Sequence, residues 1–335
     1  MTRNRTTRLS VLALCVLAML FAVAPIATAQ TTPDASGAQG DFAGLVDIGG
    51  RKIYLECSGT GSPTVVLVAG FGSSARYWTD DLSAQNPPRT MVFPRVAATT
   101  RVCAYDRPGT GAEVGDQDFF SRSDPIPQPT TPQAVVADLH AVLQTAGVPG
   151  PYVLAGHSLG GFFSRMYAST YPDDVVGMVL LDAYSEFIEP IIGPKLWPKL
   201  VKLNAPSSKP VQLPGHGDSE AIPYAKDDAY LRKLRATSPL RPMPLAVFTH
   251  GKPFVLPKDA ARQYGFTSKQ IEPILLKANQ AQAKLVPDAR FFTAKESGHD
   301  IHQDQPALVA EAIQQVVAGV RSPDTWYSLQ TCCRS

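Results

Sequence analysis

The sequence lacks several features that would define other classes of protein. It has no run of Lys and Arg residues, and so gives no electrostatic footprint for nucleic acid. It has no CxxC motif and no Cys/His spacing typical of zinc sites. It shows neither an internal repeat nor a low-complexity tract of the kind that builds scaffolds. With 335 residues and 44% hydrophobic content, it can form one large α/β domain with an insertion, or two modest domains. We expect a protein that acts on small molecules.

The N-terminal apolar stretch is too short for a membrane anchor. At residues 9–23 it falls below the roughly 20 residues that span a bilayer. Three arginines precede it, and the small residues of Ala27-Thr28-Ala29 follow it. This pattern predicts a secretory signal peptide over residues 1–29 that is cleaved after Ala29. No adjacent arginine pair supports the twin-arginine route. We therefore expect a secreted, periplasmic or cell-envelope protein.

Cleavage would leave a small net charge and four cysteines. The leader holds three basic residues and no acid, so the net charge of +2 (31 minus 29) becomes −1 (28 minus 29). Cys57, Cys103, Cys332 and Cys333 remain. In an exported protein an even count suggests disulfides, and four cysteines allow three pairings. The alternative is that Cys57 and Cys103 are small buried hydrophobic residues in two strands.

Short apolar segments alternate with longer amphipathic segments along the chain. The strand-like segments are 52–57, 64–70, 100–106, 151–156, 175–182, 244–249 and 289–294, and the helix-like segments are 132–147, 162–171 and 306–320. This alternation predicts an α/β fold, with a mostly parallel sheet sandwiched by helices.

The interval at 183–242 interrupts this rhythm. It is rich in Pro and Lys and is too long for a simple loop between core strands, so we interpret it as an inserted cap. The predicted core is then 42–182 and 243–322. Residues 30–41 are expected to form a flexible N-terminus, and 323–335 a C-terminal tail.

The stretch from Gly156 to Gly160 matches the pattern G-x-S-x-G, with Ser158 at its centre. A strand-like segment precedes it and a helix-like segment follows. In this setting the serine sits on a strained strand-to-helix turn that needs small neighbours and lifts its hydroxyl toward substrate.

This stretch resembles the nucleophile elbow of the α/β-hydrolase superfamily, and the similarity extends over nearly all of residues 45–320. "LVAGFGSSARYW" occupies the place of the oxyanion loop, "YDRPGTG" that of a turn after a strand, and "SGHDIHQDQPALVAEAI" that of the catalytic histidine loop and final helix. The resemblance implies an eight-stranded sheet and a catalytic order of Ser, acid, His.

A serine nucleophile needs a histidine base downstream, for which His216, His250, His299 and His302 are candidates. His299 follows the last strand-like segment and is our choice. Two alternatives are His302 as the base, and an H-x-x-H metal pair of His299 and His302 with Asp300 or Asp304.

The acid is harder to place. Many members of the superfamily carry it after the seventh strand, but "FTHGKPF" (248–254) has no carboxylate. Other members carry it after the sixth strand, where "VLLDAYSE" offers Asp182 first and Glu186 second. We choose Asp182, with Asp259 as a remoter third candidate.

The resemblance also assigns the oxyanion hole to the backbone N–H groups of Phe71 and Leu159. Ala69 stands where many relatives have histidine, a change that leaves backbone donation intact.

The leading hypothesis is an exported serine hydrolase that cleaves carboxylic esters through Ser158, His299 and Asp182. It would need no metal and no organic cofactor. Other activities of the superfamily stay open: aminopeptidase of the proline iminopeptidase type, lactonase and cofactor-free haloperoxidase. Haloalkane dehalogenase is disfavoured because the nucleophile of those enzymes is aspartate. A noncatalytic binding protein on a hydrolase scaffold is the alternative of a different class. The oligomeric state is not predicted.

Overall fold

The computed structural model describes residues 40–83, 86–111, 113–114, 117–203, 211–213, 215–254, 262, 265 and 267–328. The predicted signal peptide, Cys332, Cys333 and the third candidate acid, Asp259, lie outside the described residues. No helix in the described ranges is both long enough and apolar enough to span a membrane.

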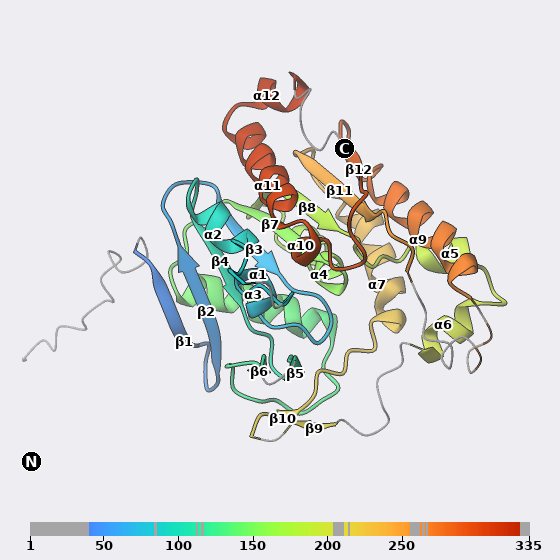
Figure 1. Cartoon of the computed structure of the whole chain (residues 1–335), viewed down its shortest axis with the longest axis horizontal. Helices are drawn as coiled ribbons and strands as arrows, with labels where there is room; N and C mark the ends of the chain where they lie inside the picture. Colours follow the sequence, from blue (N-terminus) through green and yellow to red (C-terminus); the bar gives the residue numbers. More distant parts are fainter. Residues whose placement is uncertain are drawn as a thin grey trace, which may run out of the picture. The chain divides into compact units, whose positions relative to one another are not determined.

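An eight-stranded sheet forms the centre of the fold (Figure 1), in the order β1-β2-β4-β3-β7-β8-β11-β12. The strands are β1 (Phe42–Asp47), β2 (Lys52–Ser58), β3 (Thr64–Val68), β4 (Val102–Tyr105), β7 (Tyr152–His157), β8 (Val175–Leu181), β11 (Leu245–His250) and β12 (Arg290–Ala294). The pairs β1·β2 and β2·β4 are antiparallel, and the remaining pairs are parallel. The prediction of a mostly parallel, eight-stranded α/β sheet is confirmed.

Two hydrophobic cores lie on opposite faces of this sheet because side chains alternate along each strand. In β3, Val66 and Val68 belong to one core, and Val65 and Leu67 to the other. The first core includes side chains of α3 (Pro132–Thr145) and α4 (Leu159–Thr170). The second includes side chains of α2 (Val92–Ala97) and α11 (Pro306–Arg321). The short helices α1 (Arg76–Thr79) and α10 (Ile301–Asp304) pack against each other beside this second layer.

The segment between β8 and β11, predicted as a cap, holds several short elements. They are α5 (Ile188–Ile192), α6 (Trp197–Leu203), the β9 (Gln212–Leu213) and β10 (Gly217–Asp218) hairpin, and α7 (Tyr224–Thr237). A second small hairpin, β5 (Glu113–Val114) with β6 (Gln117–Asp118), lies earlier in the chain. Helix α7 packs against α4, and α5 packs against α9 (Ser268–Gln282), which the sequence pattern did not indicate.

Of the two alternatives for Cys57 and Cys103, a disulfide or two buried free cysteines, the structure has the disulfide. Cys57 and Cys103 face each other in the β2·β4 pair and form a disulfide. Within the predicted C-terminal tail, Pro323–Ser328 forms helix α12, and its Trp326 packs into the second core.

Candidate active site

Ser158 sits at the sharp junction of β7 and α4. Its backbone φ of 51° and ψ of −122° form a strained conformation that non-glycine residues rarely adopt. The neighbouring glycines allow this turn because no side chain would fit. A Cβ on Gly156 would lie 2.6 Å from the carbonyl oxygen of Gly160, and a Cβ on Gly160 would lie 2.1 Å from that of Val68. The hydroxyl of Ser158 is therefore held at a fixed point on the rim of the sheet, where it is partly exposed.

Asp182 follows β8, the strand beside β7. The two strand ends are joined by a hydrogen bond from Ser158 N to Leu181 O over 2.9 Å. The Asp182 side chain is only 3% exposed, and its backbone has a positive φ of 44°. Burial opposes its ionisation, yet hydrogen bonds from His250 and His299 hold the pKa of this carboxyl well below its usual range. Asp182 is thus a buried carboxylate at the carboxyl edge of the sheet.

His299 lies in the loop between β12 and α10. Its Nδ1 is 2.6 Å from Asp182 Oδ2, and its side chain is 36% exposed. Burial lowers its pKa, but the hydrogen bond and charge of Asp182 outweigh this and raise the pKa overall. The ring of His157, the residue before Ser158, lies 4.7 Å from the ring of His299. Across the described residues, His299 Nε2 and Ser158 Oγ make no hydrogen bond, with each other or with another protein group.

The other sequence candidates lie elsewhere. Glu186 forms a buried ion pair with Arg165, so it does not reach His299. His302 is fully buried between the rings of Trp78 and His157. His216 packs its ring against that of Phe120 at a tilt, in the turn between β9 and β10.

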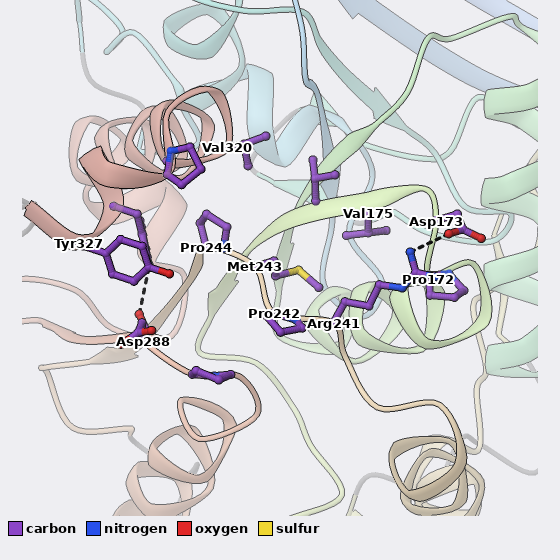
Figure 2. Close-up of a pocket in the computed structure, with 15 residues that line it drawn as sticks. Pro172, Asp173, Val175, Arg241, Pro242, Met243, Pro244, Asp288, Val320 and Tyr327 are labelled. Carbon is purple, nitrogen blue, oxygen red and sulfur yellow. Dashed lines mark hydrogen bonds and ion pairs between the residues drawn. The ribbon is translucent and has the colours of Figure 1, made fainter.

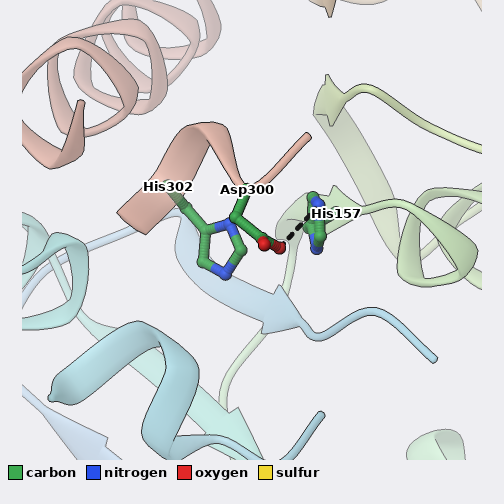
Figure 3. A group of neighbouring side chains, drawn as sticks. All are labelled: His157, Asp300 and His302. Carbon is green, nitrogen blue, oxygen red and sulfur yellow. Dashed lines mark ion pairs between the residues drawn. The ribbon is translucent and has the colours of Figure 1, made fainter. Parts of the chain in front are cut away.

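His157, Asp300 and His302 form a tight cluster (Figure 3), whose ligand atoms lie within 4.8 Å of one another. It differs from the H-x-x-H pair that was left as an alternative, because His299 bonds to Asp182 instead. His157 Nε2 already lies 3.0 Å from the carbonyl oxygen of His299, and the rings of His157 and His302 pack at a tilt, with their centroids 4.3 Å apart. Burial lowers the pKa of both rings, that of His157 to about 3. These neutral rings fit a packing role behind the His299 loop better than a metal site.

The predicted oxyanion donors lie next to Ser158. Leu159 is the first residue of α4, so its N–H has no acceptor within the helix. A Cβ built on Gly70 would lie 3.3 Å from Ser158 Cβ, so the loop that carries Phe71 rests against the turn. Within the described chain, neither the Leu159 nor the Phe71 N–H donates to a protein acceptor.

The family model for the alpha/beta hydrolase family matches residues 65–312, about three quarters of the chain. The chain belongs to the alpha/beta hydrolase family. This match covers all the site residues described above.

Several curated relatives of this alpha/beta hydrolase share part of its sequence. An uncharacterised protein of Schizosaccharomyces pombe is 33% identical over 151 residues, which cover 40% of this chain and 26% of that protein. YqjL of Bacillus subtilis, also uncharacterised, is 27% identical over 260 residues, covering 77% and 85% of the two chains. A putative carbamate hydrolase, RutD of Escherichia coli, is 29% identical over 123 residues, covering 37% and 38%. The first two relatives found are matched over only about a quarter of their own length.

Solved structures show the same fold. The haloalkane dehalogenase DatA of Agrobacterium tumefaciens superposes with a TM-score of 0.58 at 16% identity, over 86% of this chain and all of that one. Est816, described as an N-acyl homoserine lactone degrading enzyme, gives 0.52 at 18% identity, over 81% and 99%.

Two residues of this alpha/beta hydrolase bond to Asp182 in a role that was not predicted from the sequence: His250, which was considered only as a candidate base, and Asn279. His250, the last residue of β11, directs Nδ1 to Asp182 Oδ2 over 2.8 Å and Nε2 to Glu272 Oε2 over 3.0 Å. Asn279 of α9 donates to Asp182 Oδ1 over 3.0 Å. The bond to Asp182, opposed by burial and helped by Glu272, raises the pKa of His250 to about 9. His250 is therefore a buried imidazolium at the position where many relatives carry the acid itself. A histidine ending an otherwise apolar strand was the available signal.

A cavity of about 420 Å³ lies at the other end of the sheet (Figure 2). Its lining includes Val175 and Pro244, which are at the amino ends of β8 and β11. Ligands of open α/β sheets bind beyond the carboxyl ends of the strands, where Ser158, Asp182 and His299 meet. This cavity is therefore separate from the candidate active site.

Proposed function

We propose that the protein is a serine hydrolase that cleaves carboxylic esters through an acyl-enzyme intermediate. The observation that carries this proposal is the bond of 2.6 Å between His299 Nδ1 and the buried Asp182, beside a serine held in a strained turn.

Each side chain has a defined role in this mechanism. Ser158 Oγ attacks the ester carbonyl while its proton passes to His299 Nε2. Asp182 accepts the Nδ1–H bond, which fixes the imidazole tautomer and stabilises the imidazolium as it forms. His299 then gives the proton to the departing alkoxide. A water molecule, deprotonated by His299, attacks the acyl-enzyme, and His299 returns this proton to Ser158 Oγ as the bond to serine breaks and the acid leaves.

The absence of a ground-state bond between Ser158 and His299 is compatible with these roles. In unliganded enzymes catalytic hydrogen bonds are often long or poorly aligned and shorten when substrate binds. The Nε2 atom of His299 has no competing protein partner among the described residues, and the His299 side chain is 36% exposed.

The negative oxygen of the tetrahedral intermediate would be held by the N–H groups of Leu159 and Phe71. Preorganised donors of this kind often supply the largest single share of catalysis. The positive end of the α4 dipole acts in the same direction.

A substrate panel with Ser158→Ala as control tests the proposal. We expect the mature protein to hydrolyse p-nitrophenyl esters of some chain length and the variant to lose this activity. Aminoacyl anilides test for a peptidase, and aryl carbamates are included because relatives are named putative carbamate hydrolases. A folded protein that turns over none of these substrates would favour the noncatalytic binding protein. Dehalogenation is not proposed, since position 158 is serine.

We also propose export with cleavage after Ala29. N-terminal sequencing of protein recovered outside the cytoplasm should begin at Gln30, and an intact Met1 would contradict this.

A further inference from the structure

A buried ion pair lies behind the loop that carries Phe71. Arg107 follows β4, and Glu220 lies between β10 and α7, in the segment predicted as a cap. Both side chains are 2% exposed, and Arg107 Nε donates to Glu220 Oε1 over 2.7 Å. Buried pairs of this kind are weak evidence for stability in themselves. Stability alone therefore does not account for this pair, and its contacts with the 69–72 loop suggest another role.

The pair anchors both peptide groups that flank the Cα of Phe71. Arg107 Nη2 donates to Gly70 O over 2.5 Å, and this carbonyl shares a peptide group with the Phe71 N–H. Glu220 Oε2 accepts from Gly72 N over 2.6 Å, which fixes the next peptide group. In a planar trans peptide the C=O and N–H point in opposite directions. Holding the Gly70 carbonyl toward Arg107 therefore turns the Phe71 N–H away from Arg107.

The same guanidinium also holds the start of the loop. Arg107 Nη1 donates to Ala69 O over 2.8 Å, so consecutive carbonyls of the loop share one cation. The rigid fork of an arginine makes such a two-carbonyl contact possible, whereas a lysine ammonium has no fixed pair of donors.

Glu220 is itself tied to the core through its backbone. Its N–H donates to Gly109 O over 2.7 Å, beside the turn that carries Arg107. Gly109 has a φ of +76°, and a Cβ there would lie 2.5 Å from the carbonyl oxygen of Asp218. The turn therefore needs glycine for residues 218–220 of the inserted segment to approach this closely.

We propose that Arg107 and Glu220 are positioning residues for the oxyanion hole, which set the direction of the Phe71 N–H toward the carbonyl bound at Ser158. Through Glu220 the inserted segment takes part in transition-state stabilisation. This inference rests on the serine hydrolase function proposed above.

The chain offers a matched control in the Arg165–Glu186 pair. These side chains are 2% and 0% exposed, with a distance of 2.8 Å between Arg165 Nη1 and Glu186 Oε2. Their hydrogen bonds run to Gln282 and to each other, and none is made to the 69–72 loop.

The test compares Glu220→Gln, Glu220→Asp and Arg107→Lys with Glu186→Gln, each below its own Tm. Removal of one oxyanion donor costs about 10²- to 10³-fold in kcat, so a misdirected donor should cost about 10-fold or more while KM changes by no more than about twofold. Glu186→Gln should lower Tm and leave kcat within about twofold. Reaction of a fluorophosphonate with Ser158 should slow in parallel with kcat, because its phosphoryl oxygen occupies the same hole.

The outcomes separate this inference from the proposed function. If wild-type Ser158 does not react with the fluorophosphonate, the proposed function fails. If the wild-type protein reacts and any folded Arg107 or Glu220 variant keeps wild-type kcat and labelling rate, the positioning role is wrong. The role is equally wrong if their kcat falls no further than that of Glu186→Gln at a matched loss of Tm.

Discussion

Asp182→Asn should cause a large loss of activity, because three side chains donate hydrogen bonds to the Asp182 carboxylate. Asp182 Oδ2 accepts hydrogen bonds from His299 Nδ1 over 2.6 Å and from His250 Nδ1 over 2.8 Å. Its Oδ1 accepts one from Asn279 Nδ2 over 3.0 Å. An asparagine has one acceptor oxygen and one NH₂ donor. If its oxygen faces the histidines, its NH₂ meets the NH₂ of Asn279. If it is flipped, both imidazoles face a donor.

The expected loss follows from these alternatives. With a neutral partner, the imidazolium of His299 loses its stabilising charge, and the preferred tautomer changes. The same substitution in serine proteases lowers kcat by about 10⁴-fold, or about 5 kcal/mol of barrier. The fold should survive because Glu272 remains bonded to His250 and leaves that cation one carboxylate.

The assay is kcat for the best p-nitrophenyl ester, with Tm measured on the same samples. Asp288→Asn is the control, since Asp288 also has a positive φ, of 58°, but lines the cavity at the far end of the sheet. It should keep wild-type kcat. An Asp182→Asn protein that is folded and retains more than about a tenth of wild-type kcat would refute the reasoning, because a tenfold loss is only about 1.4 kcal/mol.

Four further predictions have defined outcomes. The value of kcat/KM should rise with pH, because His299 acts as a base only when it is neutral. The inflection should lie above pH 6.5, because the pKa of His299 is raised. His250→Gln should move that inflection to higher pH, because the imidazolium of His250 lowers the pKa of His299; an unchanged or lower inflection contradicts this. Gly160→Ala should lower stability by about 1–3 kcal/mol by overpacking, as a urea titration would show, since its Cβ meets carbonyl oxygens at 2.1 and 2.5 Å. Replacing Cys57 and Cys103 by alanine should cost about 2–5 kcal/mol in the same titration with kcat unchanged, and equal stability would argue against the bridge.

The sheet was predictable because its strands are continuous apolar runs bounded by turn residues. Residues 64–68 and 152–157 are buried at every position, and this burial is what their apolar composition indicates. Helix α9 was missed because its buried face is narrow: only Ile271, Ala278, Asn279 and Gln282 are buried, and two of these are polar.

A local motif identified Ser158, which stands in a five-residue pattern that requires the turn. Asp182 and His299, which bond across 117 residues, were expected only from the order of residues that the resemblance implies. The bond between Asp182 and His250, across 68 residues, was not expected. The second histidine on the acid depends on β8 and β11 being neighbours in the sheet. Glu220 reaches Arg107 from an inserted segment that no strand or helix pattern places. Only the folded chain brings these groups together.

The central claim is that Ser158 is the nucleophile of a hydrolase, activated by His299 and Asp182. Peptide mass spectrometry of the mature, folded protein after treatment with a fluorophosphonate tests it most directly. We expect a single phosphonyl adduct on Ser158, formed in step with loss of esterase activity and absent from His299→Ala after the same time with the reagent. A folded protein that stays unmodified at Ser158, or that loses activity through an adduct on another residue, would contradict it.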